Sequence, residues 1–169
     1  GYYSTNTNDI AKYVGVSIGI IYQYFNDKKE IFIEGIKKYS DNIMFPILDI
    51  LNNNKVKFNN LLDEMLNTFI KKHTLSKKAH EEMIALSHQD EDIAEIFHNK
   101  EILTTTKIIE ALNKNGINST NLFEKVHIII GIVENYCHEI VYHQHKNIDY
   151  NVMKKEVIKT ITFMLNDKI

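Results

Sequence analysis

Two small groups of residues in the 169-residue chain carry side chains that can ligate a metal. His138, His143 and His145 lie close to Cys137, and imidazole and thiolate groups are the usual protein ligands of zinc. Most of these histidines are not spaced four residues apart, and no second ligand group accompanies them, so a role at a helix end or an interface is favoured. The acidic segment 89–93, QDEDI, can bind a cation, but it is more typical of an exposed helix start. We therefore expect neither a metal nor a cofactor.

Catalytic chemistry has little support in this sequence. It contains no Ser-His-Asp order, no phosphate-binding glycine loop and no Cys-x-x-Cys pair. The single cysteine excludes an intramolecular disulfide and fits a reducing compartment. No apolar run approaches the roughly 20 residues of a membrane span, and no signal peptide is visible. These observations predict a cytoplasmic protein that is not an enzyme.

Composition and periodicity predict an all-α fold. One proline and six glycines leave little material for the turns of an all-β protein. Apolar residues recur at three-to-four spacing along 58–73, 93–112, 121–144 and 151–165, which is typical of amphipathic helices. The third of these segments is apolar on two faces, so it must be covered on two sides. Pro46 is expected to end or kink a helix that begins at Lys28.

The segment GVSIGIIYQYFNDKKEIF, residues 15–32, contains two helix starts only ten residues apart. Ser17 is expected to cap one short helix, and Asp27, in a D-x-x-E box, is expected to cap the next. A helix capped by Asn6 and closed by Gly15 precedes them. Two helices joined by a turn of about three or four residues have the spacing of a helix-turn-helix.

The segment IAKYVGVSIGIIYQYFNDKKEI, residues 10–31, resembles the DNA-binding motif of the tetracycline-repressor (TetR) family. The positions that match in register are Ile10, Ala11, Gly15, Val16, Ser17, Gly19, Tyr22, Tyr24, Phe25, Lys28, Glu30 and Ile31. The resemblance implies an all-α protein with a helix-turn-helix DNA-binding domain over residues 1–45 and a ligand-binding and dimerisation domain over 46–169. That family has a further helix before GYYSTNT, so the first helix of the DNA-binding domain is expected to be missing from the given residues.

Several matching residues are expected to contact operator DNA. Tyr22 and Tyr24 can reach phosphate oxygens through their hydroxyl groups, and contacts of this kind position a protein without reading sequence. Gln23 is the strongest candidate for reading a base, because glutamine can bridge adenine in the major groove. Isoleucines at positions 18 and 20 can touch a thymine methyl group, which favours an A·T-rich operator. The predicted DNA-binding set is Thr7, Ser17, Ile18, Gly19, Ile20, Tyr22, Gln23, Tyr24 and Lys28.

The apolar residues of the motif are expected to form a small core between the two crossed helices. This core comprises Ile10, Ala11, Val14, Val16, Ile21 and Phe25. For Tyr22, a partly buried position in this core is the alternative to a DNA contact.

The resemblance also implies a homodimer through the last two helices and an effector bound among the middle helices. Gly131 lies inside the apolar run 126–133 and would allow two helices to cross closely. Aromatic and methionine side chains suggest an apolar or mixed small molecule, although a packed core would look the same. The candidate pocket residues are Met65, Phe69, His73, Met83, Phe97, Leu103, Tyr136 and Ile140.

The predicted function is a ligand-responsive transcriptional regulator, a repressor that a small-molecule effector releases from its operator. The alternative is a helical, dimeric protein-interaction module whose degenerate motif no longer binds DNA. Weak positive charge argues for the alternative, because residues 1–40 hold five lysines against four acids, a net charge of +1, and the chain has no arginine. The two isoleucines in the motif argue in the same direction.

Overall fold

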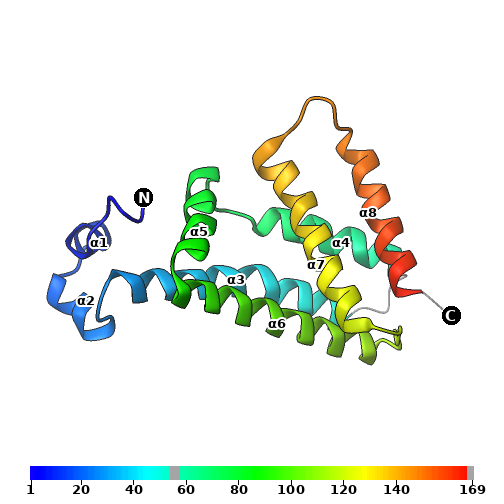
Figure 1. Cartoon of the computed structure of the whole chain (residues 1–169), viewed down its shortest axis with the longest axis horizontal. Helices are drawn as coiled ribbons and strands as arrows, with labels where there is room; N and C mark the ends of the chain where they lie inside the picture. The colour runs from blue at the N-terminus through cyan, green and yellow to red at the C-terminus, as the bar shows by residue number, and fades with distance from the viewer. Residues whose placement is uncertain (54–57, 167–169) are drawn as a thin grey trace. The chain divides into compact units, whose positions relative to one another are not determined.

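The computed structural model describes residues 1–53 and 58–166, and every regular element within these ranges is helical (Figure 1). The elements are α1 (Thr7–Val14), α2 (Ile18–Tyr24), α3 (Lys28–Asn53), α4 (Phe58–Lys72), α5 (Lys77–Gln89), α6 (Glu91–Lys114), α7 (Leu122–His138), the π-helical turn η1 (Glu139–His143) and α8 (Tyr150–Leu165). The predicted all-α fold is confirmed. Among the described residues, no helix has the length and apolar character needed to cross a membrane.

The capping signals in the N-terminal sequence act as predicted. The Asn6 side chain accepts a hydrogen bond from the Asp9 backbone N–H, and the Asp9 carboxylate accepts one from the Asn6 N–H, which closes a capping box on α1. Gly15 ends this helix in the left-handed conformation, with φ 74°, where glycine carries no steric cost. Asp27 caps α3 by accepting a hydrogen bond from the Glu30 N–H at 2.9 Å.

Pro46 was expected to end or kink its helix, and it does not end it. The helix α3 continues from Lys28 to Asn53 with the proline inside it. Ile43, Ile47 and Leu51 follow one another at four-residue spacing on both sides of Pro46, and they are only 7%, 4% and 2% exposed. The burial of this continuous stripe outweighs the lost backbone hydrogen bond, because each buried aliphatic side chain contributes about 1.5–3 kcal/mol.

The penultimate helix also ends earlier than its apolar pattern predicted. Regular α-helix stops at His138, and η1 follows. Gln144 then takes the left-handed conformation, with φ 51°, and its N–H donates to the Glu139 carbonyl at 2.8 Å. The wider π-helical turn and the left-handed residue together end the helix just before the loop to α8.

The chain forms two compact units, which are described separately. The N-terminal unit comprises Gly1–Asp41 and Leu75–Phe97, and the bundle unit comprises Asn42–Thr74 and His98–Ile169. Helix α5 and the start of α6 therefore pack with the helix-turn-helix, although they are far from it in sequence. The predicted division of function between residues 1–45 and 46–169 stays a prediction.

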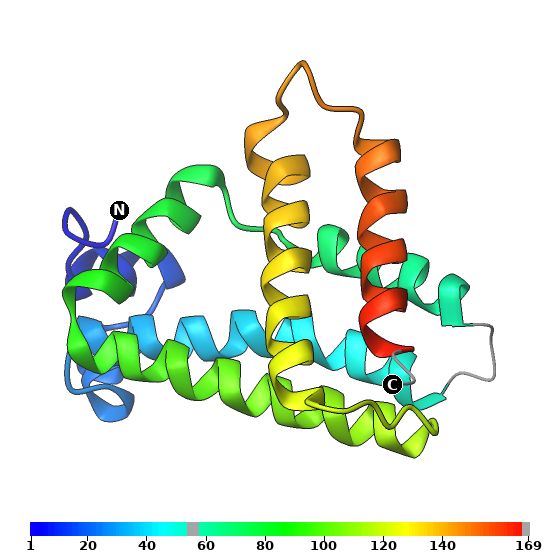
Figure 2. The same cartoon turned by 45° about the vertical axis from the view of Figure 1, so that its right-hand side comes forward.

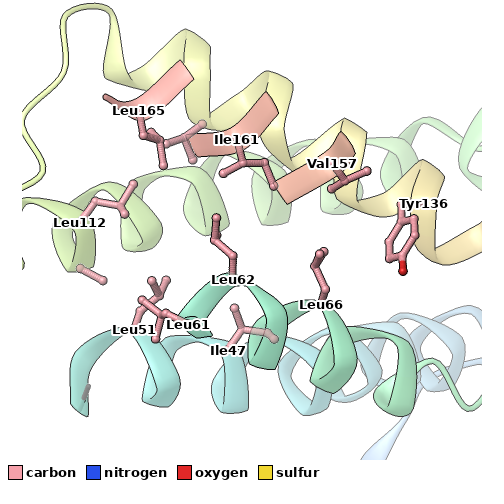
Figure 3. Close-up of a cluster of buried hydrophobic side chains, with 12 residues drawn as sticks. Ile47, Leu51, Leu61, Leu62, Leu66, Leu112, Tyr136, Val157, Ile161 and Leu165 are labelled. Atoms are coloured by element: carbon pink, nitrogen blue, oxygen red, sulfur yellow. The ribbon is translucent and has the colours of Figure 1, made fainter. Parts of the chain in front are cut away.

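The bundle unit is built around one apolar cluster. Figure 3 shows Val157, Ile161 and Leu165 of α8 facing Leu62 and Leu66 of α4. Ile47 and Leu51 of α3, Leu61, Ala111, Leu112, Val126 and Tyr136 complete the buried set. Helices α7 and α8 run side by side in both Figure 1 and Figure 2. The two apolar faces predicted for the penultimate helix are thus partly explained by packing within one chain.

Candidate DNA-binding site

The short helix α2 presents one side to the protein and the other to solvent. Ile21 is buried, and Ile18 and Phe25 are half-buried at three- and four-residue spacing from it. At 3.6 residues per turn, the opposite side of the helix carries Ile20 and Gln23. Both of these side chains are exposed, and Ile20 is 43% exposed. Ile20 and Gln23 therefore lie at the centre of the outward surface of α2, whereas Ile18, which was also predicted to contact a base, lies on the side that packs against the protein.

Tyr22 and Tyr24 flank that surface on opposite sides of the helix. They are 56% and 76% exposed, so Tyr22 is not a core residue, and the alternative for this position is excluded. Phe25, the third ring of the motif, is half-buried, as expected. The aromatic residues of the motif thus differ in role. Phe25 packs against the protein, and Tyr22 and Tyr24 leave their hydroxyl groups exposed, as the predicted phosphate contacts require.

The start of α2 is organised by Ser17. Its hydroxyl oxygen accepts a hydrogen bond from the Ile20 N–H at 3.4 Å, and Ser17 is the N-cap. A Cβ atom added at Gly19 would meet nothing closer than the Ser17 hydroxyl oxygen at 3.8 Å. Gly19 is exposed, and no neighbour among the described residues is close enough to require a glycine at this position. Thr7, the first residue of α1, is half-buried.

Two residues of the predicted small core are exposed, and for them the prediction was wrong. Val14 is 54% exposed and Val16 is 36% exposed, whereas Ala11 and Ile21 are buried. Val14 is the last residue of α1, and Val16 lies in the turn between α1 and α2.

Lys28 is engaged within the N-terminal unit. Its ammonium group donates to the carbonyl oxygens of Tyr2 and Thr5, at 2.6 and 2.9 Å, and lies 4.3 Å from the centre of the Tyr2 ring. An ammonium group has three N–H donors, and these two bonds use two of them. Contact between Lys28 and DNA stays a prediction, and the structure gives this residue a second role in positioning residues 2–5, which precede the cap of α1.

Four further polar contacts join distant segments of the N-terminal unit, and no pattern in the sequence predicts them. Lys29 pairs with Asp90 at 2.7 Å and with Asp92 at 2.5 Å. The Tyr2 N–H donates to Glu82 at 2.9 Å, and the Tyr3 hydroxyl donates to Gln89 at 2.9 Å. These pairs are separated by more than sixty positions in the chain, so no periodicity or local motif can reveal them.

The ion pair between Lys29 and Asp90 shifts the pKa of both partners. Hydrogen bonds that Lys29 donates to the Asp90 and Asp92 carboxylates raise the pKa of Lys29 well above its ordinary value. The hydrogen bond from Lys29 in turn lowers the pKa of Asp90. Asp90 also accepts from the N–H groups of Asp92 and Ile93, at 3.1 and 3.2 Å, so the acidic segment 89–93 starts a helix as expected.

The family model for bacterial regulatory proteins of the TetR family matches residues 1–34, which contain this helix-turn-helix. Residues 1–34 therefore form a DNA-binding domain of the TetR family.

Two solved structures resemble the chain over nearly its whole length. One, named as a TetR-family transcriptional regulator from Syntrophomonas wolfei, has a TM-score of 0.71 and 18% identity, and the match covers 100% of this chain and 88% of that one. Another, named as a TetR-family transcriptional regulator from Mesorhizobium loti, has a TM-score of 0.63 and 15% identity, with 98% and 87% covered. At these identities the likeness concerns the fold alone. No curated protein matches the chain.

The eight predicted pocket residues do not gather in one place. Met65, Phe69, Tyr136 and Ile140 belong to the apolar cluster of the bundle unit, and the His73 ring lies 4.5 Å from the Phe69 ring. Met83 and Phe97 belong instead to the apolar cluster of the N-terminal unit, where Met83 is buried. Leu103 is 46% exposed. Spacing along a helix placed these residues on apolar faces but could not tell which cluster each face joins.

The histidines near the end of α7 form ring contacts. The ring of His138 lies 5.6 Å from those of His73 and Tyr142, and the rings of His143 and His145 stack at 5.7 Å. His145 pairs with Glu139 at 2.6 Å. Within the described residues, no group of three or more His, Cys, Asp or Glu side chains is placed to hold a metal ion. Burial lowers the pKa of His73, although its contact with the Phe69 carbonyl opposes this shift.

Proposed function

We propose that this TetR-family regulator is a homodimeric repressor that a small-molecule effector releases from its operator. The proposed DNA-contacting set is the one predicted from the sequence without Ile18, which lies on the inward side of α2. The exposed outward surface of α2 carries the proposal, because it combines an amide, an apolar side chain and two flanking hydroxyl groups at the position where a helix-turn-helix meets the major groove. Two copies of this helix would meet successive major grooves, about 34–36 Å apart for half-sites one turn apart.

A dimer through α7 and α8 is supported by apolar side chains that one chain leaves uncovered. On α7, Phe123 and Ile128 are 42% and 54% exposed, and on α8, Val152 and Phe163 are 53% and 76% exposed. Gly131 is also exposed on α7, and a Cβ atom added there would have no described atom within 4 Å apart from its sequence neighbours and the backbone of its own helix. Exposed apolar groups of this size on adjacent helices are typical of an interaction surface.

The proposed effector site lies in the bundle unit, near the C-terminal ends of α4 and α7. Phe69, His73, Tyr136 and Ile140 bring aromatic, imidazole and aliphatic groups to this region, which suits an apolar or mixed ligand. Met83 and Phe97 belong to the other unit's core and are left out of this proposal. The effector would act by changing the separation of the two DNA-binding domains, which requires different effector affinities in the two states.

Binding to a random-sequence duplex at increasing salt tests the DNA-binding function. Phosphate contacts give log affinity a negative slope against log salt, and the interaction-module alternative predicts no measurable binding. A thermal-shift screen of small molecules would then find effectors, and fluorescence anisotropy would measure operator release. Phe69→Ala should abolish the response to an effector while DNA binding persists. Phe45→Ala is a matched control, because Phe45 is 57% exposed and should leave the response intact.

A further inference from the structure

The turn that follows α6 contains the only Asn-Gly pair in the chain, Asn115 and Gly116. Both residues are exposed to solvent. Gly116 takes the left-handed conformation, with φ 77°, and its N–H donates to the Asn113 carbonyl at 3.0 Å. Because glycine has no Cβ atom, other groups can approach its backbone closely. An asparagine side chain therefore closes onto the next backbone nitrogen most readily when glycine follows it.

The Asn115 side chain also links two helices of the bundle unit. Its NH₂ group donates to the Ala111 carbonyl at 2.8 Å and to the Leu51 carbonyl at 2.7 Å, across 64 positions of the chain. Leu51 is 2% exposed, and its carbonyl is among the last four of α3, which lack a partner within an α-helix. A buried carbonyl that loses its donor destabilises the fold. This one amide group thus joins the C-terminal ends of α3 and α6.

Ring closure at the Asn-Gly pair would turn the amide into a carboxylate. The Gly116 nitrogen gives up its proton and forms a bond to Cγ of Asn115, and the amide C–N bond breaks, so that the NH₂ group leaves with a proton as ammonia. Water then adds across one C–N bond of the cyclic imide, which opens to aspartate or isoaspartate. The ionised product has no hydrogen to donate, and its negative charge would face two carbonyl oxygens.

The native hydrogen bonds oppose this reaction. It consumes both the NH₂ group of Asn115 and the N–H of Gly116, so the bonds to Leu51, Ala111 and Asn113 must all be lost before the product forms. Because the carboxylate cannot donate, the two side-chain bonds do not form again afterwards.

We propose that Asn115 is a site of spontaneous deamidation that its hydrogen bonds protect, and that conversion to a carboxylate breaks the link between the ends of α3 and α6. The site belongs to the bundle unit and lies outside the helix-turn-helix. The inference therefore does not depend on the proposed function.

Incubation of the full chain in a mildly alkaline buffer, with and without guanidinium chloride, tests the modification. Cleavage after lysine releases residues 115–125 as one peptide, in which mass spectrometry can locate the change from amide to acid. In the denatured chain, Asn115 should convert faster than Asn118 of the same peptide, because the side chain of Ser119 hinders ring closure. In the folded chain, Asn115 should convert more slowly than in the denatured chain by about fivefold or more, the combined effect of two hydrogen bonds.

Asn115→Asp introduces the product directly, and Asn113→Asp is its matched control. Asn113 is exposed and equally close to the C-terminal end of α6, so both variants place the same charge near the same helix end. Asn115→Asp should lower the thermal midpoint more than Asn113→Asp above about pH 4, where an aspartate carboxyl group ionises. The difference should narrow at lower pH, because a protonated carboxyl group can donate to one carbonyl oxygen.

Each measurement can overturn a separate part of the inference. A denatured chain in which Asn115 stays unmodified would show that it is not a deamidation site. Equal conversion rates in the folded and denatured chains would show that the hydrogen bonds give no protection. If the two aspartate variants had equal midpoints at every pH, the amide would not link α3 to α6.

Discussion

The main apolar cluster of the N-terminal unit buries four side chains, whereas that of the bundle unit buries twelve. The N-terminal unit compensates with directional contacts between distant segments: Lys28 on two carbonyl oxygens, Lys29 on two carboxylates, and the tyrosine contacts with Glu82 and Gln89. Apolar burial is non-directional and grows with area, while each hydrogen bond contributes only about 0.5–1.5 kcal/mol. The contrast indicates that the stability of the N-terminal unit depends more on the geometry of its hydrogen bonds and ion pairs. The stability of the bundle unit depends more on the amount of apolar surface that it buries.

The largest effect should come from opening a cavity in the bundle unit. Ile161 is 1% exposed, and Ile161→Ala should lower the free energy of unfolding by about 2–5 kcal/mol through lost burial and a residual cavity. Denaturant unfolding would measure the loss. Thr160→Ala, at the exposed neighbouring position, should change stability by less than about 0.5 kcal/mol. Equal effects of the two substitutions would show that the bundle does not depend on this cluster.

The next effect concerns association. Gly131→Leu adds a bulky side chain at an exposed position where, among the described residues outside its own helix, nothing lies within 4 Å of the added Cβ atom, so the protomer should fold normally. Overpacking at a crossing of two chains should weaken the dimer by about 1–3 kcal/mol. Sedimentation equilibrium would show a monomer fraction appearing at micromolar concentration. A wild-type chain that is already monomeric under these conditions would contradict the proposed dimer.

A smaller effect is expected from the cap of α1 in the N-terminal unit. Asn6→Ala removes the side chain that accepts the Asp9 N–H at 3.0 Å, and it should cost about 1 kcal/mol. The exposed Asn8, on the same helix, provides the control Asn8→Ala, which leaves the cap intact. Comparing the thermal midpoints of both variants would sharpen the contrast between units. If Asn6→Ala lowered the free energy of unfolding as much as Ile161→Ala, the proposed difference between the two units would be contradicted.

The smallest effect is a pH dependence in the N-terminal unit. The pKa of Asp90 is lowered from its ordinary value of 3.8 by Lys29, so the folded state binds this proton less readily than the unfolded state. The stabilising contribution is therefore present above pH 3.8 and disappears as the pH falls through the lower folded pKa. The raised pKa of Lys29 has the opposite sign: its contribution is present below about pH 10.5 and is lost at higher pH.

Lys29→Met should consequently reduce the thermal midpoint at neutral pH, and the difference from the wild type should vanish toward low pH. Midpoints measured from pH 2 to pH 8 would test this. A difference that stays constant over that range would show that Lys29 contributes through packing of its methylene groups and not through charge.

The Asn6, Ser17 and Asp27 caps were predictable because each depends on hydrogen bonds to backbone groups within about three residues. The outward position of Ile20 and Gln23 was predictable for a similar reason, since the 3.6-residue period places them opposite Ile21. The sequence by itself therefore determined the helices of the motif, their order and the outward surface that we propose meets DNA.

Tertiary structure decided the rest. It carried α3 through Pro46, because buried side chains on both sides of the proline outweigh the local penalty. It assigned Met83 to one apolar cluster and Met65 to the other, and it turned Lys28 and Lys29 toward partners within the N-terminal unit. These outcomes depend on contacts between segments far apart in the chain, and a helical period specifies which side of a helix is apolar but not what covers it.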